Sequence, residues 1–335
     1  MDIYGTLGPS CAEGPILVQM FQNGMTGIRL NLSHISLPEA ADQIKMLHEA
    51  AKEAGVKPQL LIDMQGPELR VGRMSAPIWL ENSGSVYLAA KPEKNSILIS
   101  KEVFLSIENG QELLLDDGKL LIEAVSKNEN RIKARVIRGG VLAGRKSIAL
   151  VGKTIDMPPM TADDLANIRK AKNYGVTAVM QPFVRNREDL MAVRSALDEA
   201  GSPDIRLFAK IENMDGVRDI DELIPAADEI VIARGDLGNA VPLPTLPAVQ
   251  KRLAKKCREA GKPFMVVTQM LASMEKNPVP TRAEVSDIFN AVLDGAASVM
   301  VTGETAAGRY PAETIRYLSG TVRAAEQYMK EMKDT

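Results

Sequence analysis

The sequence predicts an α/β fold, a (β/α)8 TIM barrel with a small all-β lid domain inserted after its third strand. Eight short, mostly apolar runs alternate with segments of helical periodicity, and such runs are typical of a parallel sheet that helices cover on both faces. Between about residues 69 and 156 the helical periodicity disappears and only short β-like runs remain. We therefore expect a barrel formed by residues 1–68 and 157–335, with an inserted domain at 69–156.

Three βα units precede the insertion. Their expected strands are Ile3–Leu7, Gly27–Leu32 and Gln59–Asp63. The helices between them cover about Gly14–Asn23 and Pro38–Ala54, and each ends just before a glycine, as helices commonly do.

Glycines and one Asp-Gly pair separate the β-like runs of the insertion. Asp117-Gly118 lies between apolar runs, which is a hairpin signal. The expected strands are Ile78–Leu80, Val86–Ala89, Ser96–Ile99, Glu112–Leu115, Lys119–Ala124 and Arg131–Val136. Because an insertion of this kind leaves from the loops of one barrel face, we expect it to act as a lid.

The alternation of strands and helices returns after Pro158-Pro159. Thr161 begins a helix to about Tyr174, with acidic residues in its first turn, where they favour a helix N-terminus. The remaining strands are Ala178–Gln181, Ile205–Phe208, Glu229–Ala233, Phe264–Val267 and Ser298–Val301. The remaining helices are near Arg187–Glu199, Val217–Leu223, Leu246–Ala260, Arg282–Leu293 and Ala312–Met332.

The composition argues against several classes of function. The 335 residues carry 43 acidic and 41 basic side chains, so no charge excess predicts a nucleic-acid or membrane partner. With only His34 and His48, a multi-histidine zinc site and a Ser-His-Asp hydrolase are not expected, and any metal should be a hard ion bound by oxygen. Cys11 and Cys257 have no disulfide or metal spacing, and no signal peptide or transmembrane run is apparent, which favours the cytoplasm.

Polar side chains occur where the predicted strands end. Lys210 and Glu212 are two residues apart, so in extended backbone both face the same side. Alone they could be a surface ion pair, but in a barrel all strand ends meet at one mouth. The residues expected there are Arg29, Asn31, Ser33, His34, Asp63, Gln65, Glu68, Arg70, Lys210, Glu212, Arg234, Gly235, Asp236, Thr268, Gln269, Thr302, Gly303, Glu304 and Thr305.

These residue types predict a metal-assisted reaction on an anion. Glu212 and Asp236 offer two carboxylates for Mg²⁺. Water and the substrate phosphate would then complete the coordination of the ion. Three cations suit phosphate or carboxylate oxygens, namely Arg29, Arg70 and Lys210. Thr268 adds a hydroxyl for a proton relay. A metal, several cations and no histidine base favour phosphoryl transfer or enolate chemistry.

A series of short motifs extends over almost the whole chain. The motifs are Gly5-Thr-Leu-Gly-Pro-Ser10, Ile28-Arg-Leu-Asn-Leu-Ser-His34, Gly66-Pro-Glu-Leu-Arg70, Leu115-Asp-Asp-Gly118, Gly139-Gly-Val-Leu142, Ala209-Lys-Ile-Glu-Asn-Met-Asp-Gly216, Ala233-Arg-Gly-Asp-Leu-Gly238, Thr268-Gln-Met-Leu271, Pro280-Thr-Arg-Ala-Glu-Val-Ser-Asp287, Ala291-Val-Leu-Asp-Gly295 and Gly303-Glu-Thr-Ala306. In content and order they resemble the pyruvate kinase family.

The resemblance implies a TIM barrel with a β-domain lid, and a glycolytic phosphotransferase that moves the phosphoryl group of phosphoenolpyruvate to ADP, giving pyruvate and ATP. It also implies a short form that lacks the family's C-terminal effector domain, and hence lacks sugar-phosphate allostery. By position, Lys210 matches the lysine that neutralises the transferring phosphoryl group and the enolate. Arg29 matches the phosphate-contacting arginine, and Thr268 the threonine near the carbon that gains the proton.

The resemblance also implies the ligands of two cations and of the nucleotide. Glu212 and Asp236 match the ligands of Mg²⁺ or Mn²⁺, and Gly235 and Asp236 begin the segment that holds the substrate carboxylate. Three residues match ligands of K⁺: Asn31, Ser33 and Asp63. His34 lies where the family contacts nucleotide, and together with Asn31 and Arg70 it makes up the expected cofactor-binding residues.

The chain departs from the family pattern on the nucleotide side. Gln65 stands where the family usually has lysine, and Asp163 stands at the lysine that meets nucleotide phosphate. An anion in place of a cation beside a polyphosphate costs binding by Coulomb repulsion, on the order of a few kcal/mol.

Three hypotheses therefore stay open. The first is a pyruvate kinase that uses Mg²⁺ and K⁺. The second is a divergent paralogue that uses the pyruvate-enolate site for another phosphoryl acceptor or for carbon–carbon lyase chemistry. The third, a non-catalytic phosphoenolpyruvate sensor, is disfavoured because binding alone does not require the hydroxyl of Thr268. Whether the chain forms a homo-oligomer stays open as well.

Overall fold

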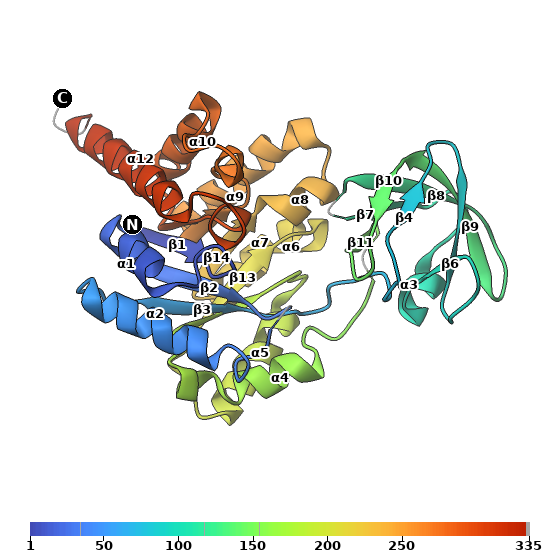
Figure 1. Cartoon of the computed structure of the whole chain (residues 1–335), viewed down its shortest axis with the longest axis horizontal. Helices are drawn as coiled ribbons and strands as arrows, with labels where there is room; N and C mark the ends of the chain where they lie inside the picture. The colour runs from blue at the N-terminus through green and yellow to red at the C-terminus, as the bar shows by residue number, and fades with distance from the viewer. Residues whose placement is uncertain (34, 117, 154, 333–335) are drawn as a thin grey trace. The chain divides into compact units, whose positions relative to one another are not determined.

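The computed structural model describes residues 1–33, 35–116, 118–153 and 155–332, which form two compact units. The first unit consists of Met1–Gly66, Pro159–Leu237 and Pro244–Thr335. The second consists of Pro67–Pro158 and Gly238–Leu243. Figure 1 labels many of the helices and strands and colours the chain from its N-terminus to its C-terminus.

A closed barrel of eight parallel strands forms the first unit and confirms the predicted (β/α)8 fold. Around the barrel the order is β1, β16, β15, β14, β13, β12, β3 and β2. Their bounds are β1 (Asp2–Thr6), β2 (Gly27–Asn31), β3 (Gln59–Asp63), β12 (Ala178–Gln181), β13 (Arg206–Ile211), β14 (Glu229–Ala233), β15 (Phe264–Val267) and β16 (Ser298–Met300). β3 and β12 pair directly, although the second unit separates them in sequence.

Most residues of the barrel strands are apolar, because both faces of the sheet are covered. Every residue of β12, β14 and β15 is buried. Large side chains from around the barrel, among them Tyr4, Phe208 and Met265, form one core cluster. Burial of each large apolar side chain stabilises the fold by about 1.5–3 kcal/mol. This core holds the strand ends, and the polar residues on them, in a rigid ring.

Helices cover the outside of the barrel (Figure 1). The helical elements of the chain other than the insertion's own helix are α1 (Gly14–Gln22), α2 (Ala41–Glu53), α4 (Ala162–Ile168), η1 (Ala171–Tyr174), α5 (Arg187–Glu199), α6 (Met214–Arg218), α7 (Ile220–Ala226), α8 (Arg234–Ala240), η2 (Leu243–Thr245), α9 (Leu246–Glu259), η3 (Ala272–Glu275), α10 (Arg282–Leu293), α11 (Gly303–Ala306) and α12 (Pro311–Glu331). Of these, α8 and η2 belong partly to the second unit. Capping boxes begin α4 at Thr161 and α10 at Thr281. Within the described residues, no helix is both long and apolar enough to cross a membrane.

The structure corrects several of the expected element bounds. β13 continues to Ile211 because its pairing with β14 extends beyond Phe208, so Lys210 lies within the strand. The helix expected near Val217–Leu223 is two short helices that meet at Asp219. The helix that begins after Thr161 ends at Ile168 and is followed by η1. The short helices α8, directly after β14, and α11, shortly after β16, were not predicted.

The second unit contains two sheets with a core of their own. Its strands are β4 (Ile78–Leu80), β5 (Ser85–Ala89), β6 (Ser96–Leu98), β7 (Glu112–Leu115), β8 (Leu120–Lys127), β9 (Arg131–Arg138), β10 (Gly140–Leu142) and β11 (Ile148–Leu150). Six strands form one sheet in the order β11, β7, β8, β9, β5, β6, and β10 pairs with β4. The helix α3 (Lys101–Ser106), capped by Ser100, was not predicted. That this unit acts as a lid stays a prediction.

Candidate active site

The carboxyl ends of the barrel strands bring most of the predicted site residues to one mouth. Arg29 and Asn31 lie in β2, Asp63 ends β3, and Lys210 lies in β13 with Glu212 directly after it. Gly235 and Asp236 belong to the first turn of α8, directly after β14, and Thr268 follows β15. Since β13 and β14 are neighbours, Glu212 and Asp236 come from adjacent strand ends.

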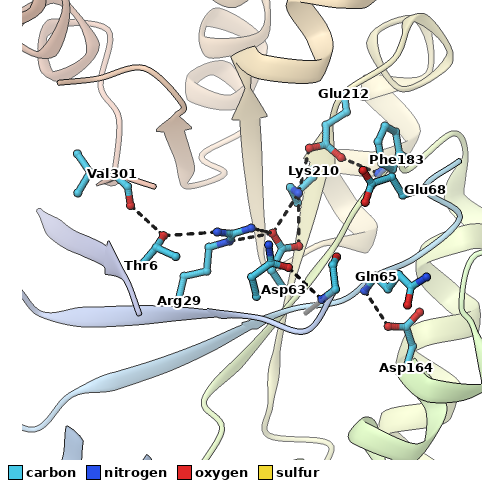
Figure 2. Close-up of polar contacts among 12 residues, drawn as sticks. Thr6, Arg29, Asp63, Gln65, Glu68, Asp164, Phe183, Lys210, Glu212 and Val301 are labelled. Carbon is cyan, nitrogen blue, oxygen red and sulfur yellow. Dashed lines mark hydrogen bonds and ion pairs between the residues drawn. The ribbon is translucent and has the colours of Figure 1, made fainter. Parts of the chain in front are cut away.

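Asp63 is the centre of a buried ion-pair network (Figure 2). Its Oδ2 accepts hydrogen bonds from Arg29 Nε at 2.9 Å and Nη2 at 2.7 Å, and it lies 3.2 Å from Lys210 Nζ. Lys210 Nζ also lies 3.0 Å from Glu212 Oε1. The predicted pairing of Lys210 with Glu212 is therefore a buried contact, with side chains only 13% and 2% exposed, and the alternative of a surface pair is wrong.

The network favours the charged forms of Asp63 and Lys210. Burial opposes ionisation of Asp63, but the charges of Lys210 and Arg29 outweigh it and hold the pKa of this carboxyl below its usual range. Burial likewise opposes a charged Lys210, yet Asp63 and Glu212 raise the pKa of its ammonium group above its usual range. Two cations and two carboxylates thus cancel within one buried cluster.

Two residues that the sequence did not single out orient this network. Thr6 Oγ1 accepts from Arg29 Nη1 at 3.5 Å and donates to the Val301 carbonyl at 3.0 Å, which links β2 to the ends of β1 and β16. The backbone N–H of Phe183 donates to Glu212 Oε2 at 2.8 Å (Figure 2). Glu212 is thus held on one side by Lys210 and on the other by the loop after β12.

Left-handed backbone occurs in the loops that follow two barrel strands. Thr268 and Gln269 have φ of 80° and 56°, and Phe183 has φ of 51°. None is glycine, so each conformation costs about 1–3 kcal/mol and persists only where surrounding contacts impose it. Strain of this kind is common at active sites.

The residues expected to bind K⁺ lie at the ends of β2 and β3. Asn31 Oδ1 accepts from the Ser33 N–H at 3.0 Å. The Asp63 carboxylate is already shared by two cations. His34 lies outside the described residues, so its predicted contact with nucleotide stays a prediction.

A buried carboxylate holds the chain where it leaves β3. Asp164 is 1% exposed and accepts from the N–H groups of Gln65 at 2.8 Å and Gly66 at 3.0 Å. It also accepts from the Thr161 N–H at 2.8 Å. From the sequence, Asp164 is one of the acidic residues expected in the first turn of the helix after Thr161, and the Thr-x-x-Asp spacing gives no sign of this second role. Its neighbour Asp163 is exposed on α4.

Arg70 and Glu68 belong to the second unit, where they pair with each other. Arg70 Nη2 lies 2.6 Å from Glu68 Oε2, and Arg70 Nη1 donates to the Arg145 carbonyl at 2.7 Å. Their expected roles at the mouth therefore stay predictions. Across the described residues, no group of three or more His, Cys, Asp or Glu side chains forms a metal cluster.

The family model described as "Pyruvate kinase, barrel domain" matches residues 1–315 of the chain. A pyruvate kinase of Geobacillus stearothermophilus is 38% identical over 98% of this chain and 57% of its own length. One of Bacillus licheniformis is 35% identical over 99% of the chain and 58% of its own length. A pyruvate kinase of Aeropyrum pernix is 37% identical over 95% of this chain and 69% of its own length. The chain thus spans little more than half the length of the first two relatives.

Proposed function

This chain belongs to the pyruvate kinase family, and from that premise we propose that it transfers the phosphoryl group of phosphoenolpyruvate to ADP, giving pyruvate and ATP. The observation that carries the proposal is the buried network of Arg29, Asp63, Lys210 and Glu212 at the barrel mouth. The names of the relatives do not favour another acceptor or a lyase reaction.

The charge balance of the mouth supports a divalent metal ion. The cations and carboxylates of the network cancel, so a polyanionic substrate needs further positive charge. Glu212 and Asp236 present two carboxylates from adjacent strand ends, which is the donor set that Mg²⁺ or Mn²⁺ takes when water and substrate complete its coordination. When bound, the ion would polarise the phosphoryl oxygens of the substrate.

A monovalent cation suits the oxygens of Asn31, Ser33 and Asp63. All three residues offer hard oxygen ligands, as K⁺ prefers. Arg29 and Lys210 already lie against Asp63, so repulsion by these two charges favours a singly charged ion over a doubly charged one at this position.

Each residue of the proposed site has a separate role in the reaction. Lys210 and Arg29 bind the phosphoryl oxygens while the bond from phosphorus to the enol oxygen breaks and a bond to the β-phosphate oxygen of ADP forms. Lys210 also stabilises the resulting enolate, and the backbone of the segment that begins with Gly235 and Asp236 holds its carboxylate. Thr268 delivers the proton that turns the enolate carbon into the methyl group of pyruvate.

The nucleotide contacts and the cell compartment belong to the proposal as well. ADP or ATP would meet His34, Asn31 and Arg70, while the exposed Asp163 would oppose the nucleotide phosphates. Cys11 and Cys257 are free and buried, which supports a reducing cytoplasm. We propose no nucleic-acid or membrane partner, and we leave a homo-oligomer open.

A lactate-dehydrogenase-coupled assay tests the function with phosphoenolpyruvate, ADP, Mg²⁺ and K⁺. Lys210→Met should lower kcat by roughly 10³-fold or more, because it removes the charge that stabilises the transferring group and the enolate. The matched control is Lys45→Met on α2, whose side chain is 75% exposed and pairs only loosely with Glu49 at 4.0 Å. Absence of ADP-dependent pyruvate from the wild-type chain at any nucleotide concentration would refute the proposal.

A further inference from the structure

The turn after β15 is strained at the residue that we propose to carry the proton. Thr268 and Gln269 both have left-handed backbone, with φ of 80° and 56°. A β-branched residue rarely adopts this conformation, and it persists only where neighbouring groups impose it. The contacts that impose it therefore determine where the Thr268 hydroxyl lies.

Arg234 holds the beginning of this turn. Its Nε and Nη2 donate to the Thr268 carbonyl oxygen at 3.2 Å and 2.7 Å. Its Nη1 donates to Asp287 Oδ2 at 2.6 Å, and Nη2 also lies 2.9 Å from Met270 Sδ. A planar guanidinium group can make these contacts at once, and an ammonium group cannot. Arg234 thus joins α8, the turn and α10 through a side chain that is only 13% exposed.

Glu304 holds the other end of the turn. It is 1% exposed, its Oε1 accepts from the Leu271 N–H at 3.1 Å, and its Oε2 accepts from the Thr302 N–H at 2.7 Å. Between these two anchors the Thr268 side chain lies against Gly235. A Cβ at Gly235 would come within 3.0 Å of Thr268 Cγ2, so glycine permits this close approach.

We propose that Arg234, held by Asp287, is a positioning residue for the protonation step. It keeps the Thr268 hydroxyl beside Gly235, where the substrate carboxylate is held in the proposed function on which this inference rests. In that step the C2–C3 π electrons of the enolate form a C–H bond with a proton from the Thr268 hydroxyl, directly or through one water. The enolate oxygen forms the ketone C=O, and solvent returns a proton to Thr268.

The test separates protonation from phosphoryl transfer. Three variants weaken the anchor: Arg234→Met, Arg234→Lys and Asp287→Asn. The matched control is Arg194→Met, because Arg194 makes the same kind of contacts, to the Ile205 carbonyl at 2.9 Å and to Asp228 at 2.6 Å, at the opposite end of β13. Phosphoryl transfer is followed as ATP formed from phosphoenolpyruvate and ADP. Proton transfer is followed as deuterium exchange into the pyruvate methyl group with ATP, Mg²⁺ and K⁺.

We expect Arg234→Met to lower methyl exchange at least tenfold while ATP formation falls less than threefold, and to raise the solvent deuterium isotope effect on pyruvate formation. Arg234→Lys should lower methyl exchange and ATP formation by similar factors to Arg234→Met. In Asp287→Asn methyl exchange should again fall more than ATP formation, but by a smaller factor. An equal fall in both rates, or the same split in Arg194→Met, would overturn the inference.

A structural measurement decides the positioning without turnover. In protein labelled with ¹³C-methyl threonine, the Thr268 methyl resonance, assigned with Thr268→Ser, should shift in Arg234→Met and Asp287→Asn and stay in place in Arg194→Met. If the wild-type chain exchanges pyruvate protons but forms no ATP, the proposal that ADP is the phosphoryl acceptor fails. The methyl exchange rates and the Thr268 methyl resonance of the variants still test the role of Arg234. If neither reaction occurs, the proposed function fails, and an unshifted resonance would overturn the role of Arg234 as well.

Discussion

Replacing Asp63 by asparagine should destabilise the barrel, because its carboxylate is the shared partner of two buried cations. Asp63 is 2% exposed, and its Oδ2 lies 2.7 Å from Arg29 Nη2 and 3.2 Å from Lys210 Nζ. With an effective dielectric constant of about 20, Coulomb's law gives about 6 and about 5 kcal/mol for unit charges at these separations. The cost of burying the charges offsets much of this attraction, so we expect a net loss of about 3–5 kcal/mol.

A double-mutant cycle tests the reasoning behind this number. Lys210→Met should cost less than Asp63→Asn, because Arg29 still neutralises Asp63. The variant that carries both substitutions should lose less free energy of unfolding than the sum of the two single losses, by about 1–3 kcal/mol. Urea unfolding followed by circular dichroism at 222 nm reports on the helices, most of which belong to the first unit. A coupling energy under about 0.5 kcal/mol would refute the reasoning.

The same carboxylate should make stability depend on pH in one direction. Burial opposes ionisation of Asp63, but Lys210 and Arg29 hold its pKa below the usual value of 3.8. A depressed pKa stabilises the fold above the unfolded pKa, and this contribution is lost as the pH falls through the folded pKa. The stability difference between wild type and Asp63→Asn should therefore stay constant above about pH 5 and shrink below about pH 4. A difference that grows in acid would contradict the assignment.

Three further predictions concern the first unit. Gly66→Ala should cost about 1–3 kcal/mol more than Gly55→Ala, because both have positive φ but only at Gly66 would a Cβ meet a proline ring, at 2.4 Å. Asp164→Asn should cost about 1.5–3 kcal/mol through its lost charge-assisted hydrogen bonds, whereas the exposed neighbour Asp163→Asn should change the urea midpoint little. Burial raises the pKa of Glu229, so the stability contributed by its protonated form is lost as the pH rises. The urea midpoint of Glu229→Gln should therefore increase relative to that of wild type between pH 4 and pH 8.

Urea midpoints check all three predictions, and each has a distinct failure. Equal losses in the two glycine variants would show that the loop after β3 relaxes around the added methyl group. A loss in Asp163→Asn as large as in Asp164→Asn would mean that helix dipole effects, not the hydrogen bonds to the loop, are responsible. For Glu229→Gln, a midpoint difference that does not change with pH would show that the side chain stays ionised at no cost.

The periodicity of the sequence predicted the barrel well because buried parallel strands consist mostly of apolar residues. The strands Gln59–Asp63, Ala178–Gln181 and Glu229–Ala233 have the predicted bounds. The short helices α8 and α11 were missed because each begins at or shortly after the end of a strand and lacks the length for a periodic pattern. The helix α3 was missed because it is only six residues long and lies within a β-rich segment.

The sequence by itself determined the fold and the residue types at the mouth, since spacing alone places Lys210, Glu212 and Asp236 at strand ends. Only the tertiary structure decided which charges meet. Asp63, Arg29 and Lys210 are far apart in sequence, and their contact depends on the neighbourhood of strands in the closed barrel. The contacts of Arg234 with Thr268, and of Asp164 with the loop after β3, also join segments that are far apart in sequence. Local sequence patterns do not encode such contacts, because closure of the sheet, not chain proximity, brings the groups together.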